Sequence, residues 1–240
     1  MKGRTGTFIS LLLCNIKLQY RQGFTAAWAV ISGFYILGLY FIPENIKMKI
    51  LPLILLSEPS TFAMIFTGAI LLLERDEGLL ENLFITPMSI RQYMLSKALA
   101  LSLPACICTT AIAAVLSGPA WSLLLIPPGI ILTTIFFVLL TFIPASASRD
   151  IMGLLFRIGI YGSLFTFSIL DYFGVLGGYH QYLLPSKGTL DMMSIAIGTK
   201  EGSILTLVLS LISLCGGILI ILPISEKHFR KNLIESGGIA

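Results

Sequence analysis

The sequence predicts an all-α integral membrane protein with six transmembrane helices. Of its 240 residues, 56% are hydrophobic and only 12% are charged, whereas an ordinary soluble domain has about 25% charged residues. The apolar residues form runs close to the ~20 residues that a helix needs to cross the hydrocarbon layer. These runs do not alternate between polar and apolar residues, so helices rather than strands are expected.

Six expected spans follow one another along the chain, with short polar joints between them. They cover residues 25–41, 51–73, 98–116, 123–144, 152–176 and 204–224. Neither an internal repeat nor a separate soluble domain is visible in the sequence. We therefore expect residues 1–240 to form a single transmembrane domain, in which the six spans occupy residues 25–224.

Residues 1–24 are too polar to cross a membrane, and they predict an N-terminal amphipathic surface helix. The apolar face of this helix carries Phe8, Leu11, Leu12, Ile16 and Tyr20. The opposite face carries Ser10, Lys17 and Arg21. A helix divided in this way lies in the membrane surface, with its basic side chains toward the headgroups. At the other end of the chain, residues 225–240 are expected to form a charged cytoplasmic tail.

The positions of lysine and arginine predict that both termini are cytoplasmic. With the N-terminus inside, 12 of the 16 basic residues lie in inner segments. The four on the outside are Lys47, Lys49, Lys187 and Lys200. This orientation is favoured because membrane proteins carry an excess of basic residues in their cytoplasmic loops. An even number of spans then places the joint between the second and third spans in the cytoplasm.

The segment 74–97, which contains this joint, is the densest polar interruption in the chain. A stripe at helical spacing is formed by Leu79, Leu80, Leu83 and Phe84. Glu77 and Glu81 lie one turn apart at the edge of the stripe. A merely solvated loop, which is the plainer interpretation, has no need of an apolar face. We therefore predict a short cytoplasmic coupling helix that docks into a groove on a partner.

The segment then breaks and starts a second helix. Proline disfavours helical geometry at the residue before it, so Thr86-Pro87 ends the first helix. Ser89 and Gln92 have the spacing of a capping box, which predicts that a new helix begins here and runs into the third span. A helix, a break and a second helix form a rigid projection, as a membrane protein needs if a soluble partner pushes on it.

Catalytic signatures are absent from the sequence. There is no G-x-x-x-x-G-K-[ST] phosphate loop, no H-E-x-x-H and no G-x-S-x-G. His180 and His228 lie far apart in the expected topology, and all four cysteines lie in apolar segments without metal-ligand spacing. We therefore expect no catalytic residue, metal or cofactor in this chain. Energy for directional work must then come from a partner or an ion gradient.

Three ionisable residues fall inside expected spans, where they are functional candidates by default. Glu58 lies about two turns from the outer end of the second span, and Pro59 beside it frees backbone carbonyls. Both residues could line a substrate pathway, or Glu58 could lie at the membrane interface, and both interpretations stay open. We expect Arg157 to reach the inner headgroups and Asp171 to lie at the outer interface.

The outer joint 177–203 contains a helix-like segment at residues 190–197. Tyrosines at positions 172, 179 and 182 lie close to it in sequence. Aromatic residues gather at membrane interfaces. We therefore expect this segment to form an interfacial cap that partly dips into the outer leaflet. Lipid anchoring is the more common reason for such residues, and the alternative is that the cap guards an exit.

The segment 74–97 resembles the type-2 ABC transporter permease family. An acidic cluster after the second span is followed by E-G-x-L-E-x-L, a Thr-Pro-x-Ser step, and a tyrosine and a lysine before the third span. These residues are Glu74, Glu77, Gly78, Leu80, Glu81, Leu83, Thr86, Pro87, Ser89, Tyr93 and Lys97. The family often has threonine where this chain has Leu79. The surface helix and six spans are also similar, so the likeness covers nearly the whole chain.

A finer likeness distinguishes between members of this family. The segments 168–173 and 182–185 are similar to permeases of fluoroquinolone or multidrug exporters. The heme-exporter permease of cytochrome c maturation has a similar size and a related cytoplasmic segment, and it is a competing resemblance. The drug-export-like members are expected to be the nearer relatives.

The resemblance implies a membrane complex in the prokaryotic plasma (inner) membrane. Two permeases, either two copies of this chain or one copy with a paralogue, would bind two separate ABC ATPase subunits. The ATPases would bind ATP and Mg, and nucleic acid would have no part in the complex. The residues expected to couple to the ATPase are Glu74, Glu77, Gly78, Leu79, Leu80, Glu81, Leu83, Phe84, Pro87 and Arg91.

The leading interpretation of function is therefore the transmembrane permease subunit of an ABC exporter. It would form the pathway for a drug-like or other amphipathic molecule and would not itself be an enzyme. The alternatives are a non-transporting accessory or assembly protein, a heme-exporter-type permease, and an ion-coupled carrier that depends on Glu58. Substrate identity does not follow from the sequence, because an apolar cavity has no signature in one chain.

Overall fold

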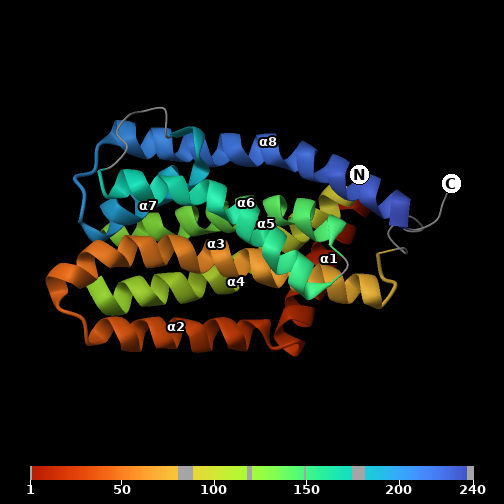
Figure 1. The fold of residues 1–240 in the computed structure, drawn as a ribbon, viewed down its shortest axis with the longest axis horizontal. Coiled ribbons are helices and arrows are strands. Elements are labelled where there is room, and N and C mark those ends of the chain that lie inside the picture. The colour runs from red at the N-terminus through yellow and green to blue at the C-terminus, as the bar shows by residue number, and fades with distance from the viewer. Residues whose placement is uncertain (1, 81–88, 118–120, 149, 175–181, 237–240) are drawn as a thin grey trace.

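A computed structural model of the chain describes residues 2–80, 89–117, 121–148, 150–174 and 182–236 (Figure 1). It is 90% helical, and no strand occurs in the described residues. The helices are α1 (Lys2–Arg21), α2 (Phe24–Tyr40), α3 (Glu44–Asp76), α4 (Ile90–Ser117), the short 3-10 helix η2 (Trp121–Leu125), α5 (Ile126–Ala147), α6 (Ile151–Tyr172), α7 (Pro185–Ile197) and α8 (Ile204–Ser236). The predicted all-α class is confirmed.

Five helical segments are long and apolar enough to cross a membrane. They are Glu44–Asp76, Ile90–Ser117, Leu123–Ala147, Ile151–Tyr172 and Ile204–Asn232. A sixth span is counted only if the bent pair Phe8–Arg21 and Phe24–Tyr40, whose axes meet at 61°, is taken as one crossing. The structure therefore has five or six spans among the described residues, and the number six stays a prediction.

The long helices lie side by side and define two ends of the bundle. At the proximal end, α3 and α5 finish and α4 and α6 begin, on the right of Figure 1. At the distal end, α2, α4 and α6 finish and α3, α5 and α8 begin, on the left. Most residues of α5 are buried, because α5 contacts α3, α4, α6, α7 and α8. The core is therefore built around α5.

Two helices are longer than the sequence predicted. The joint expected at residues 42–50 is instead mostly the first turns of α3, which runs unbroken for 33 residues through Pro52 and Pro59. Pro43 stands immediately before α3, where its fixed backbone angle favours a helix start. Likewise, α8 continues past residue 224 to Ser236, so the expected tail extends the last helix. Local polarity did not stop either helix, because charged residues are good helix formers.

Local hydrogen bonds explain where α3 ends and where α4 begins, on either side of the polar joint. Gly78 has a left-handed backbone (φ 68°), its N–H donates to the Arg75 carbonyl, and the Leu79 N–H donates to the Glu74 carbonyl. This Schellman motif ends α3. The capping box at the start of α4 is confirmed, since Ser89 N–H donates to Gln92 Oε1 (3.2 Å) and Gln92 N–H donates to Ser89 Oγ (3.3 Å).

The cap expected at residues 190–197 is the helix α7, and the expectation that it lies against lipid is wrong. α7 begins earlier, at Pro185, and its residues Thr189, Leu190, Met192 and Met193 are buried. Thr189 and Thr133 of α5 share a hydrogen bond of 2.7 Å. The short helix is enclosed because α3, α5, α6 and α8 all contact it. Tertiary packing therefore decided its position, and the sequence pattern alone did not show it.

We expect Gly188→Ala to destabilise the fold, because α7 packs directly on the backbone of α8 there. A Cβ at Gly188 would lie 2.7 Å from the Ser210 backbone oxygen and 3.2 Å from its Cα. Forced overpacking of this kind costs about 1–3 kcal/mol. Gly216→Ala on α8 is the control, since a Cβ there meets nothing within 4 Å. Thermal unfolding in detergent should show a lower midpoint for G188A alone, and equal midpoints would contradict this packing.

Candidate functional site

A buried ion pair holds the proximal end of the bundle together. Lys97 of α4 places Nζ 2.5 Å from Oε1 of Glu74, in the last turn of α3. Their side chains are 1% and 10% exposed. A charged side chain is tolerated at a buried position only when an opposite charge and hydrogen bonds compensate for the lost hydration. The pair therefore fixes where α3 and α4 meet.

Polar neighbours complete this cluster. Tyr93 donates its hydroxyl hydrogen bond to the second oxygen of Glu74, and Lys97 Nζ lies 4.9 Å above the Tyr93 ring. Lys97 also donates to Asn15 of α1 (3.4 Å), and Asn15 donates to Ser96 (3.0 Å). Asn15 is buried, and so α1 packs on the bundle through a polar side chain. Tyr20, on the expected apolar face of α1, is 77% exposed in the single chain.

Aromatic packing connects the cluster to two further helices. The Tyr93 ring stacks on Phe229 of α8, with ring centroids 5.9 Å apart. The same ring meets Phe142 of α5 edge-on at 6.0 Å. Five helices therefore converge on Glu74, Lys97 and Tyr93, namely α1, α3, α4, α5 and α8.

Arg75, the next residue along α3, binds the end of α5. Its guanidinium donates to the carbonyl oxygens of Ser146 (2.7 Å) and Ser148. Ser146 lies in the last turn of α5 and Ser148 caps that helix, and a cation is favoured at this end by helix polarity. Because Glu74 and Arg75 point to different neighbours, the end of α3 is held on two sides.

The predicted coupling residues fall into three groups in the structure. Glu74 and Leu80 are buried, so a contact between either side chain and a partner can only be indirect. Glu77, Leu79 and Arg91 are exposed at the proximal end, and Gly78 forms the turn between them. Glu81, Leu83, Phe84 and Pro87 lie outside the described residues, and their role stays a prediction.

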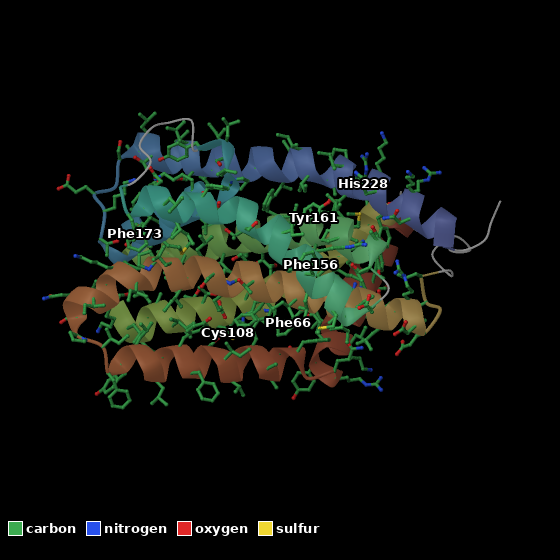
Figure 2. The ribbon with its side chains drawn as sticks, in the orientation of Figure 1. Phe66, Cys108, Phe156, Tyr161, Phe173 and His228 are labelled. Carbon is green, nitrogen blue, oxygen red and sulfur yellow. The ribbon has the colours of Figure 1, made fainter. Side chains whose placement is uncertain are left out.

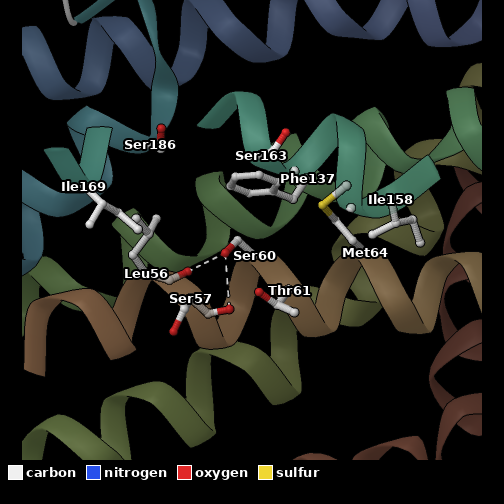
Figure 3. Close-up of a pocket in the computed structure, with 12 residues that line it drawn as sticks. Leu56, Ser57, Ser60, Thr61, Met64, Phe137, Ile158, Ser163, Ile169 and Ser186 are labelled. Atoms are coloured by element: carbon white, nitrogen blue, oxygen red, sulfur yellow. Dashed lines mark hydrogen bonds between the residues drawn. The ribbon is translucent and has the colours of Figure 1, made fainter. Parts of the chain in front are cut away.

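A cavity of about 330 Å³ lies near the middle of the bundle, between α3 and α6 (Figure 3). Its walls are largely apolar, with Met64, Phe137 and Ile158 among them. No charged side chain from the described residues lines it. It reaches the molecular surface, because the lining residues Thr61 and Gly159 are exposed.

Hydroxyl groups are the polar part of this lining. Ser57, Ser60 and Ser163 each donate a hydrogen bond to a carbonyl of their own helix, as Figure 3 shows for Ser60. The hydroxyl hydrogens of Ser57 and Ser60 are thus directed to their own helix, and their oxygens remain able to accept hydrogen bonds. Ser186 of α7 closes the far wall and shares a 2.7 Å hydrogen bond with Ser168.

Glu58 lies apart from this cavity, among α2, α3 and α4. It is fully buried and accepts hydrogen bonds from Trp28 Nε1, Thr109 Oγ1 and Ser32 Oγ, the last at 3.1 Å. Pro59 is buried beside it. Phe66 and Cys108, labelled in Figure 2, mark this side of the bundle. Neither Glu58 nor Pro59 lines the cavity, and their place in a substrate pathway stays a prediction.

Sequence reasoning missed the residues that line the cavity. Ser57, Ser60 and Thr61 have i, i+3, i+4 spacing on α3, and Gly159, Gly162 and Ser163 have the same spacing on α6. The sequence therefore contains two stripes of small residues, one on α3 and one on α6, that could have indicated the cavity. Within the described residues, no group of three or more His, Cys, Asp or Glu side chains could hold a metal.

Comparison with known proteins identifies the family. The model of the fluoroquinolones export permease protein family matches residues 7–236. The chain belongs to this family of type-2 ABC transporter permeases. Comparison with curated proteins and with solved structures gave no significant match.

The match confirms the resemblance to type-2 ABC permeases seen in the segment 74–97, and it agrees with the drug-export-like resemblance seen in the segments 168–173 and 182–185. The chain is thus the permease type of subunit, a multi-pass membrane component of an export system. Fold and family agree, because a multi-pass permease requires several membrane-spanning helices and the structure has five or six apolar helices long enough to be spans.

We expect Lys97→Met to destabilise the permease strongly. Glu74 would then be a buried charge without its cation, which costs about 3–5 kcal/mol. The double variant Glu74→Gln/Lys97→Met should recover most of the loss, because the glutamine that replaces Glu74 carries no charge and can still accept a hydrogen bond from Tyr93. Chemical unfolding in detergent measures the free energies.

Lys49→Met, at an exposed position at the distal end, serves as the control and should resemble the wild type. A single variant as stable as the wild type, or a double variant as unstable as the single one, would show that the Glu74–Lys97 pair does not hold the proximal end.

Proposed function

We propose that the chain is the transmembrane permease subunit of an ABC exporter in the prokaryotic plasma membrane, with both termini cytoplasmic. The cavity between α3 and α6 is part of the pathway along which a drug-like amphipathic molecule is exported. The observation that carries the proposal is the lining of that cavity, with apolar walls, several hydroxyls and no charged group among the described residues.

The lining favours an amphipathic substrate over a highly charged one. Small-molecule sites are typically ~300–1,000 Å³ and mostly apolar, with a few placed polar groups, and the cavity of about 330 Å³ fits the lower part of this range. An ion would lose its hydration there without gaining a counter-charge. Hydroxyl oxygens would accept hydrogen bonds from substrate N–H or O–H groups. Fluoroquinolones, named in the family description, are the first substrates to test.

Two ABC ATPase subunits would supply the energy at the proximal end, with ATP and Mg bound to them. Glu77 and Leu79 are exposed there, close to the end of α3. α3 continues from this end to the cavity, and Ser60 lies 14 residues, or ~21 Å, from Glu74. A movement imposed at the proximal end would reach the cavity through one continuous helix, because Glu74 ties that helix to its neighbours.

A second permease, either another copy or a paralogue, would complete the pathway. The cavity opens at Thr61, Gly159 and Ser163, which are exposed in the single chain. α6 is largely unburied, since only 20% of its apolar window lies inside the bundle. A partner against α3 and α6 would separate the cavity from lipid.

Filling the cavity should stop transport without stopping ATP hydrolysis. The permease is purified from its native membranes with the proteins bound to it and is reconstituted into vesicles. Thr61→Phe places an aromatic ring in the cavity mouth, and uptake of a fluoroquinolone into inverted vesicles should fall at least tenfold while basal ATPase activity is retained. Val208→Phe, on an exposed part of α8, is the matched control and should transport normally.

Three results would count against the proposal. Unchanged transport by Thr61→Phe would remove the cavity from the pathway. The absence of any co-purified ATPase, with no ATP-dependent uptake by the wild type, would favour a non-transporting accessory protein. Uptake driven by an ion gradient without ATP would favour a carrier instead.

A further inference from the structure

We propose that a groove between α4 and α8 at the proximal end binds the phosphate headgroup of an anionic phospholipid. The groove has a volume of about 520 Å³. It is lined by Arg91, Pro223, Glu226, Lys227, Arg230 and Lys231. This site does not rest on the proposed transport function.

Charge is the first reason for this assignment. Four of the six lining residues are cationic and one is anionic, so the formal net charge of the lining is +3. The one carboxylate, on Glu226, is compensated by Arg91 across the groove at 2.5 Å. Among the described residues, neither Lys227 nor Arg230 has an acidic partner within ion-pair distance. Lys227 and Arg230 are therefore the cations that can pair with an anion in the groove.

The distance of the groove from the distal ends of α4 and α8 places it at the level of the lipid headgroups. Lys227 follows Ile204, the first residue of α8, by about 23 residues, or ~35 Å. Arg91 precedes Ser117, the last residue of α4, by about 26 residues, or ~39 Å. The hydrocarbon layer is ~30 Å thick. The basic side chains thus lie just beyond the apolar layer, where phosphates lie, and His228 in Figure 2 marks this level on α8.

An exposed apolar track leads from the groove along α8. Leu219, Ile220 and Ile224 are 72%, 66% and 42% exposed. Ile220, Ile224, Lys227 and Lys231 recur at spacings of three or four residues, so they share one face of the helix. A ligand with a phosphate at one end and an acyl chain at the other matches this face. Basic pockets between transmembrane helices recognise anionic headgroups in this way.

The test measures lipid binding by the full chain in a neutral detergent. Phosphatidylglycerol and phosphatidylcholine are titrated separately, and bound lipid is counted by native mass spectrometry. The wild type should prefer phosphatidylglycerol. Lys227→Gln/Arg230→Gln should weaken its binding roughly thirtyfold, since each basic residue near an anionic surface contributes about a factor of five. Lys227→Arg should retain binding.

The matched control Lys47→Gln/Lys49→Gln removes two positive charges from the first turns of α3, at the distal end, and should bind phosphatidylglycerol like the wild type. Equal losses in both double variants would reduce the effect to general surface charge and overturn the site. So would equal affinity for the two lipids. Displacement of the lipid by glycerol phosphate at matched concentration would show a site for free phosphate, not for lipid. Unchanged lipid binding with loss of a co-purified ATPase would make the groove a protein-docking surface.

Discussion

The ion pair between Glu74 and Lys97 is the interaction on which the proximal end of the bundle depends. A buried pair contributes little net stability compared with apolar side chains of the same size, yet removing one partner is costly. Its effect is therefore to allow only the arrangement in which α3 and α4 bring these two charges together. Tyr93 and Asn15 extend the same constraint to α1, α5 and α8. Helices that are far apart in sequence are thus all held at the Glu74–Lys97 pair.

α3 connects the Glu74–Lys97 pair with the cavity. It runs without a break from Glu44 to Asp76, so its middle lines the cavity and its last turn carries Glu74. Pro52 and Pro59 lie inside this helix without ending it. This continuity gives a physical route between the exposed turn at Gly78 and the place where a substrate would bind. No separate signalling element is required.

Local rules predicted the helices well and their mutual packing poorly. Apolar runs gave the long helices, and the capping box at Ser89 gave the start of α4, because both depend on residues close in sequence. The burial of α7 and the inward-facing Asn15 depend on contacts with distant helices, which periodicity in one segment does not contain. For the same reason, the sequence predicts that Glu74 contacts the ATPase, whereas its side chain is buried against Lys97 of the next helix.

The most direct test of the central claim is a distance measured across the cavity mouth. Spin labels at T61C and G159C, in a chain without its native cysteines and bound to its ATPase, are compared by pulsed electron resonance with and without ATP and Mg. The same pair is measured in E74Q/K97M, which is expected to fold. If the buried pair transmits movement through α3, nucleotide will shift the distance in the wild type and leave it unchanged in the double variant. An equal shift in both proteins would contradict this account.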